Sequence, residues 1–119
     1  MQTFGKFVHD LRKQKEITLR EFCRRSRQDP SNWSKVERDL NPPPKTKIIL
    51  EQIAGALEVE PGSEDFNMMN DLVAISFIPK ELLNEEEILE KLPIFFRTVR
   101  GGPPNEKELE ELIEIIRNG

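Results

Sequence analysis

The sequence has little of the residue types from which catalytic and metal sites are usually built. Its 119 residues include one cysteine, Cys23, and one histidine, His9. One cysteine can form neither an intrachain disulfide nor a thiolate zinc site. No histidine or cysteine accompanies the glutamates to suggest a metal site, and no glycine-rich phosphate loop is present. We therefore expect a chain that is not an enzyme and needs no metal or other cofactor, with His9 at the surface.

Long hydrophobic runs are also missing. No apolar run approaches the roughly 20 residues of a membrane-spanning helix. The first residues, MQTFGKFVHDLRK, have no apolar core of the kind found in a secretory signal. Together with the single cysteine, these absences favour a cytoplasmic protein that does not bind membranes. Hydrophobic residues make up 36% of the chain and charged residues 34%, so we expect a lean core and a highly charged surface.

The charges are divided unevenly along the chain. The net charge of −4 would by itself disfavour a nucleic-acid partner. Residues 1–58, however, hold 12 Lys/Arg against 8 Asp/Glu, whereas residues 59–119 hold 6 against 14. The first part is therefore basic (+4) and the second acidic (−8). This split indicates two roles, a first half that can contact phosphates and a second half that phosphates would repel.

Apolar residues at helical spacing predict an all-α fold. Four helices are expected in the first half, at residues 3–15, 19–25, 31–38 and 45–57. Thr18, followed three residues later by Glu21, has the pattern of a capping box, and Asp29-Pro30 combines an N-cap with proline at the first helical position. Asn41-Pro42-Pro43-Pro44 is a connection that no helix can cross. The first domain is expected to span residues 1–60.

The second half, residues 61–119, is expected to be a smaller helical region. Ser63 would cap a helix extending to about Ile75, and further helices are expected at residues 85–92 and 105–116. Residues 93–100, between Leu92 and the Gly101-Gly102 pair, suit either a strand or a short helix, and we favour the helix.

The stretch ITLREFCRRSRQDPSNWSKVERD, residues 17–39, resembles the helix-turn-helix of the phage Cro/repressor-type (XRE) family. Thr18 opens the second helix as in that family, and Asp29-Pro30-Ser31 precedes the recognition helix. Ser34-Lys35-Val36-Glu37 fits the family pattern of Ser-x-apolar-Glu, and Ile53-Ala54-Gly55-Ala56-Leu57 fits a later one. The resemblance covers about residues 4–60 and implies a lambda-repressor-like bundle that binds double-stranded DNA.

The sequence departs from the family pattern at several positions. Arg27 stands in the turn where the family usually has glycine at positive φ, which would cost roughly 1 kcal/mol. Gln28 replaces an apolar residue, and Leu19 replaces a glutamine that contacts phosphate in the family. Asp39 stands where glycine often follows the glutamate. These differences concern the turn and one phosphate contact rather than the fold.

The resemblance implies site residues in three groups. The start of a recognition helix faces base edges in the major groove, and the base-reading candidates are Ser31, Asn32, Ser34 and Lys35. Lys35 would donate to guanine, Asn32 would pair with adenine, and Ser34 would serve either. The phosphate-binding candidates are Thr18, Arg20, Arg27, Arg38, Lys45 and Lys47, and Arg24 and Arg25 are weighed alongside them. The core of the motif would be Phe22, Cys23, Trp33 and Val36.

Two functions remain open from the sequence. The first is a transcriptional regulator, expected to be a repressor that acts as a homodimer, because one recognition helix offers few base contacts. The second is an antitoxin or adaptor whose acidic half binds a toxin or other protein partner. The dimer or partner surface would lie in the second half and include Phe95, Phe96, Leu109, Leu112, Ile113 and Ile116.

Overall fold

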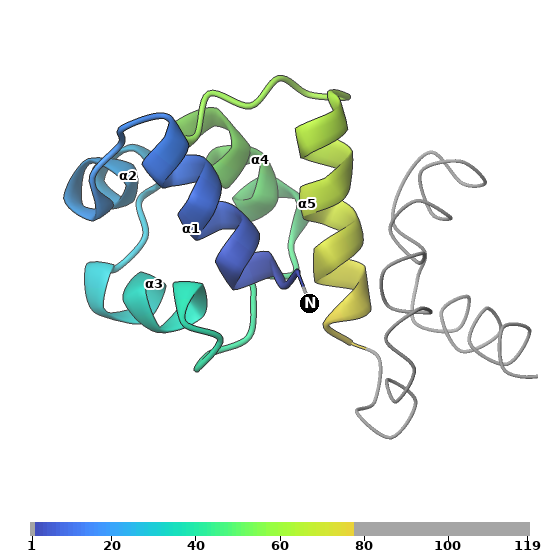
Figure 1. Ribbon diagram of the computed structural model, residues 1–119, viewed down its shortest axis with the longest axis horizontal. Helices are drawn as coiled ribbons and strands as arrows, with labels where there is room; N and C mark the ends of the chain where they lie inside the picture. Colours follow the sequence, from blue (N-terminus) through green and yellow to red (C-terminus); the bar gives the residue numbers. More distant parts are fainter. Residues whose placement is uncertain (1, 78–119) are drawn as a thin grey trace, which may run out of the picture.

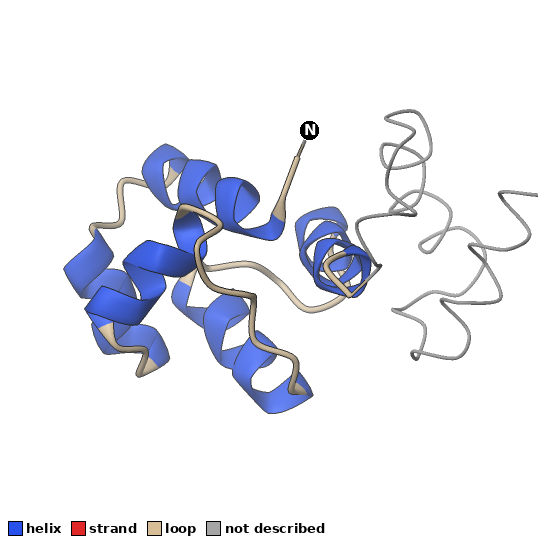
Figure 2. Ribbon diagram, turned by 90° about the horizontal axis from the view of Figure 1, so that it is seen from below, coloured by secondary structure: helices blue, strands red, loops and turns tan. Residues whose placement is uncertain are grey.

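The computed structural model describes residues 2–77 of the protein. This part of the chain is all-helical, with no strand among the described residues (Figure 2). Its five helices are α1 (Phe4–Gln14), α2 (Leu19–Ser26), α3 (Pro30–Glu37), α4 (Lys47–Ala56) and α5 (Glu64–Ile75). The all-α prediction is therefore confirmed for these residues. The expectations for residues 85–92, 93–100 and 105–116 lie outside the described residues.

Side-chain caps mark the start of every described helix except α4. The hydroxyl of Thr18 accepts a hydrogen bond from the Glu21 backbone N–H, and the Asp29 carboxylate accepts one from the Asn32 N–H, with Pro30 at the first position. Ser63 caps α5 in the same way. These residues satisfy N–H groups that the first turn of a helix leaves without partners.

Two local expectations are wrong. The fourth helix begins at Lys47 rather than Lys45, because Thr46 is extended and serves as the N-cap. Thr18 and Glu21 also do not form the full capping box, since the Glu21 carboxylate accepts hydrogen bonds from Arg24 and Arg25 instead.

Trp33 lies at the centre of the core. Its side chain is fully buried, and its ring stands edge-on to Phe4 of α1 at 6.2 Å between centroids and tilted against Phe22 of α2 at 4.7 Å. Aromatic pairs at such distances add to the burial energy of the rings. The indole therefore joins α1, α2 and α3 at one point.

The core continues across residue 60, where the sequence suggested a boundary. Met69, Leu72 and Val73 of α5 are buried in the same cluster as Val8 and Leu57. α5 lies beside α1, on the side of the bundle away from α2, whereas α3 lies at the lower edge of the view (Figure 1). Residues 61–75 thus complete the hydrophobic core of the first half. No helix within residues 2–77 is long and apolar enough to cross a membrane.

A glycine allows α1 to approach the end of α3. A Cβ atom at Gly5 would meet the Val36 carbonyl oxygen at 2.2 Å and Asp39 Oδ1 at 2.7 Å. The first contact is with backbone, so a side chain here would require the two helices to move apart. Gly5 therefore sets the spacing at which α3 packs on α1.

Helices α1 to α4 are each followed by a residue other than glycine in the left-handed conformation. Glu16, Arg27, Asp39 and Glu58 have φ between 58° and 62°, in positions that glycine usually occupies. After α1, the Glu16 N–H donates to Lys13 O and the Ile17 N–H to Arg12 O, and equivalent bonds follow α3 and α4. The positive φ considered for Arg27 is thus observed. Each such residue costs roughly 1–2 kcal/mol relative to a right-handed conformation.

We predict opposite effects of alanine at two glycines. Gly5→Ala should lower the free energy of unfolding by about 1–3 kcal/mol, because the new methyl group overlaps backbone. Gly55→Ala is the matched control. Its Cβ would meet nothing within 4 Å, and alanine is the better helix former by up to about 1 kcal/mol, so stability should rise. Urea denaturation measures both, and equal effects of the two substitutions would contradict the close approach.

We also predict that Glu16→Gly stabilises the protein by about 0.5–1 kcal/mol, because glycine adopts positive φ without a steric penalty. Lys13→Gly, three residues earlier and inside α1, should instead destabilise by about 1 kcal/mol. Thermal unfolding of both variants tests the assignment. Destabilisation by Glu16→Gly would show that this residue does not adopt the left-handed conformation.

Candidate nucleic-acid interface

A buried carboxylate fixes how α3 sits on the rest of the protein. Glu37 accepts hydrogen bonds from Arg12 Nε and Nη2, both at 2.9 Å, and from Trp33 Nε1 at 2.8 Å. His9 Nδ1 lies 2.9 Å from its Oε1. Arg12 Nη1 also donates to the Ile17 carbonyl at 2.9 Å. Each carboxylate oxygen therefore has two partners, which fills the acceptor capacity of the group.

The Arg12–Glu37 pair of this network is buried, and His9 lies at its exposed edge. The side chains of Arg12 and Glu37 are 7% and 5% exposed, whereas His9 is 44% exposed. Burial by itself raises the pKa of Glu37, but the hydrogen bonds from Arg12, His9 and Trp33 outweigh it and hold the pKa below the ordinary value of 4.5. Glu37 is consequently ionised in the folded protein at neutral pH.

The rest of α3 turns its polar residues outward. Trp33, Val36 and Glu37 face the core, and a helix of 3.6 residues per turn then directs Ser31, Lys35 and Arg38 to the opposite side. Ser31, Lys35 and Arg38 are exposed. Of the other base-reading candidates, Asn32 is exposed and Ser34 is half-buried, so all four share the outer half of the helix.

Two of these outer residues already have partners within the protein. Asn41 Nδ2 donates to Asn32 Oδ1 at 2.7 Å, and Arg38 Nε donates to the Ser34 carbonyl at 3.2 Å. Lys35 and Ser31 are exposed on the same half of the helix. The outer half of α3 therefore offers mainly hydrogen-bond donors: an ammonium, a guanidinium and the amide of Asn32.

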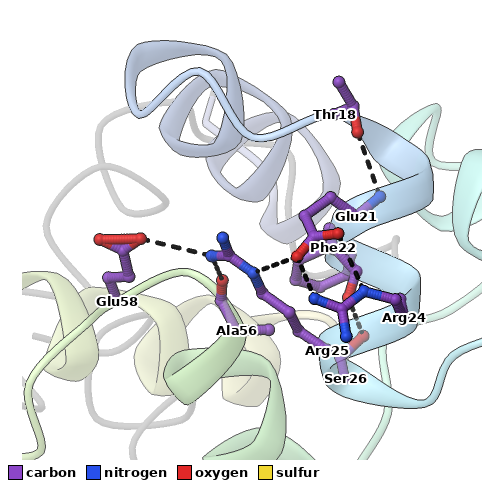
Figure 3. Close-up of polar contacts among 8 residues, drawn as sticks. All are labelled: Thr18, Glu21, Phe22, Arg24, Arg25, Ser26, Ala56 and Glu58. Carbon is purple, nitrogen blue, oxygen red and sulfur yellow. Dashed lines mark hydrogen bonds and ion pairs between the residues drawn. The ribbon is translucent and has the colours of Figure 1, made fainter.

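Arg24 and Arg25 of α2 both form hydrogen bonds with acidic side chains, and Arg25 has more partners than Arg24 (Figure 3). Glu21 pairs with Arg24 and, at 2.9 Å, with Arg25. Arg25 Nη1 also donates to the Ala56 carbonyl at 3.2 Å and lies 3.3 Å from Glu58. The hydrogen bonds that Glu21 accepts, first from Arg24 and then from Arg25, lower the pKa of its carboxyl group to about 2. Arg24 and Arg25 thus pair with acidic groups at neutral pH, and Arg25 connects α2 to the end of α4.

The phosphate-binding candidates come from separate parts of the chain. Thr18 and Arg20 lie at the start of α2, and Arg27 lies in the turn before α3, all exposed. Lys45 precedes α4 and Lys47 begins it, both exposed as well. Lys45 Nζ sits 4.5 Å from the centre of the Phe77 ring. Its ammonium therefore lies against a ring just beyond the end of α5.

The predicted core residues of the motif are all buried. Phe22, Cys23, Trp33 and Val36 have between 0% and 4% exposure. Burial raises the pKa of the Cys23 thiol, which suits a packing residue rather than a reactive one. Within residues 2–77, no group of three or more His, Cys, Asp or Glu side chains could hold a metal ion. The predicted dimer or partner surface (Phe95, Phe96, Leu109, Leu112, Ile113, Ile116) lies outside the described residues.

Comparisons with protein families, with curated proteins and with solved structures found no match to this chain.

The contacts that orient the candidate site were not predicted from the sequence. Arg12 and Glu37 are 25 residues apart, and Asn32 and Asn41 are nine apart. Neither pair follows a local pattern, so only the packing of α1 on α3 and the path of the chain after α3 bring the partners together. The sequence did contain one signal for the buried pair. A charged residue follows a core residue in each helix: Arg12 follows Leu11, and Glu37 follows Val36.

We predict that Glu37→Gln destabilises the protein by about 3–5 kcal/mol, because Arg12 would remain buried without a counter-charge. The lowered pKa also gives a pH dependence. The contribution of Glu37 to stability is fully present above its unfolded pKa, near 4.5, and is lost as the pH falls through its lower folded pKa. Urea denaturation at pH 7 and pH 3 should show a smaller loss of stability on acidification for Glu37→Gln than for the wild type. An identical loss would contradict the assignment.

Proposed function

We propose that this protein binds double-stranded DNA, with α2 and α3 forming a helix-turn-helix of the lambda-repressor type and α3 as the recognition helix. The observation that carries the proposal is the division of α3 into two faces. Trp33 and Glu37 fix its inner face to α1 and α2, while Ser31 and Lys35 stand exposed on the outer face. A rigidly held helix with an exposed polar face can enter a major groove.

The polar groups on α3 suit base recognition. Lysine donates to the N7 and O6 acceptors of guanine, and serine can donate or accept. Ser31 lies in the first turn of α3, the part that reaches base edges in this class of motif, and Lys35 lies in the last turn on the same exposed face.

Several cations are available for the phosphates on either side of the groove. The arginines of α2 that pair with Glu21 are Arg24 and Arg25, which leaves Arg20, Arg27 and Arg38 as the better phosphate ligands of this part of the chain. Thr18 and Lys47 would extend the contact, and Lys45 would join it only by leaving the Phe77 ring. Phosphate contacts position such a protein on the duplex and make its binding sensitive to salt.

In this proposal the protein is a sequence-specific transcriptional regulator of the cytoplasm, acting as a repressor and not as an enzyme. One α3 offers few base contacts, so high specificity requires a homodimer that reads two half-sites about one helical turn apart. Residues 59–119 carry a net charge of −8, which phosphates would repel, and we propose that protein contacts are made there.

The test is a gel-shift series against genomic DNA fragments at several salt concentrations. We expect a sequence preference, and we expect Lys35→Ala to weaken binding to the preferred fragment by about 1–3 kcal/mol and to relax one base position. Alanine is a good helix former, so this variant should fold normally.

Arg24→Gln is the control for the DNA-binding series. Arg24 is 71% exposed and paired with Glu21 in the same helix, so its loss should change affinity much less than Lys35→Ala. Binding without any sequence preference at all salt concentrations would refute the proposed function.

A further inference from the structure

We propose that Asn41 is a positioning residue that sets the direction of the Asn32 side chain, so that Asn32 presents its NH₂ group rather than its carbonyl oxygen to a base. The inference rests on the proposed DNA-binding function and names a chemical preference of that site. The observation behind it is the 2.7 Å hydrogen bond from Asn41 Nδ2 to Asn32 Oδ1.

Asn41 is held in place from both directions along the chain. Before it, the Leu40 N–H donates to the Lys35 carbonyl at 2.8 Å and Asp39 adopts a positive φ of 62°, which closes the end of α3. The Asn41 N–H itself lies 3.4 Å from the same carbonyl. After it comes Pro42, and a residue before proline is restricted to extended conformations. The backbone at Asn41 therefore has little freedom, and its amide is aimed at α3.

This contact restricts what Asn32 can recognise. An asparagine that pairs with adenine uses its carbonyl oxygen and its NH₂ group together on one base edge. Here the carbonyl oxygen of Asn32 already accepts from Asn41, and the side chain is exposed, so its NH₂ group is the part left for a base. Lys35, one turn further along α3, is likewise only a donor. Asn32 would therefore favour a base edge that offers acceptors alone, as guanine N7 and O6 or thymine O4 provide, over the adenine suggested by the sequence, whose N6 amino group needs an acceptor from the protein.

Binding-site selection with the full chain tests the inference, comparing the wild type with Asn32→Ala, Asn41→Ala and the double variant. The wild type should prefer guanine or thymine over adenine at the position that loses its preference in Asn32→Ala. Asn41→Ala should reduce that preference by about fivefold or more, within the range that one good base contact provides. The double variant should behave like Asn32→Ala, because the two residues act as one unit.

Asn41→Asp gives a second, directional readout. A carboxylate only accepts hydrogen bonds, so the Asn32 amide should turn its NH₂ group toward position 41 and its oxygen toward the DNA. The base preference should then move toward adenine or cytosine, whose amino groups donate. A general loss of affinity from the added negative charge would lower binding to all sequences equally and would leave the preference unchanged.

The outcomes separate this inference from the function on which it rests. If no variant binds DNA with any sequence preference, the proposed function fails and the inference falls with it. If the wild type has a clear preference that Asn41→Ala and Asn41→Asp leave intact, the DNA-binding function stands and the positioning role is refuted. Thermal unfolding of each variant within a few degrees of the wild type will show that a change of preference does not come from misfolding.

Discussion

The orientation of α3 depends on one buried carboxylate. Glu37 receives donors from α1 through Arg12 and His9 and from α3 itself through Trp33. A buried carboxylate deprived of such partners would be strongly destabilising, so α3 cannot roll about its axis without losing the network. The same network fixes which residues of α3 face solvent. The proposed function depends on the exposed face, which carries Ser31 and Lys35.

The charged residues of the described chain fall into two groups by what they contact. Arg12, Arg25 and Glu37 connect separate helices, and their charges are satisfied inside the protein. Lys35 and Arg27 belong to the second group, which projects from α3 and from the turn before it. An overall net charge does not separate these groups, which is why a chain of net charge −4 can still present cations beside a polar helix.

The ends of the helices shape the surface as much as their faces do. Left-handed residues such as Arg27 and Asp39 carry side chains where glycine would have none. Asp39 receives a hydrogen bond from Thr3, which ties the end of α3 to the start of α1. The chain then passes directly to Asn41 beside Asn32. Some conformational strain at the helix ends thus accompanies a well-defined loop next to the candidate base-reading surface.

The sequence alone determined the features that depend on near neighbours. Caps such as Thr18, Asp29 and Ser63, and apolar spacing along each helix, located all five helices of residues 2–77 to within two residues, because these signals act within one or two turns. The tertiary structure alone decided which groups meet: Arg12 with Glu37, Gly5 with the Val36 carbonyl, and Asn41 with Asn32. Such contacts depend on how the helices cross and on where the chain goes after α3. A sequence pattern contains no direct record of either, because residues distant along the chain become neighbours only when the core around Trp33 forms.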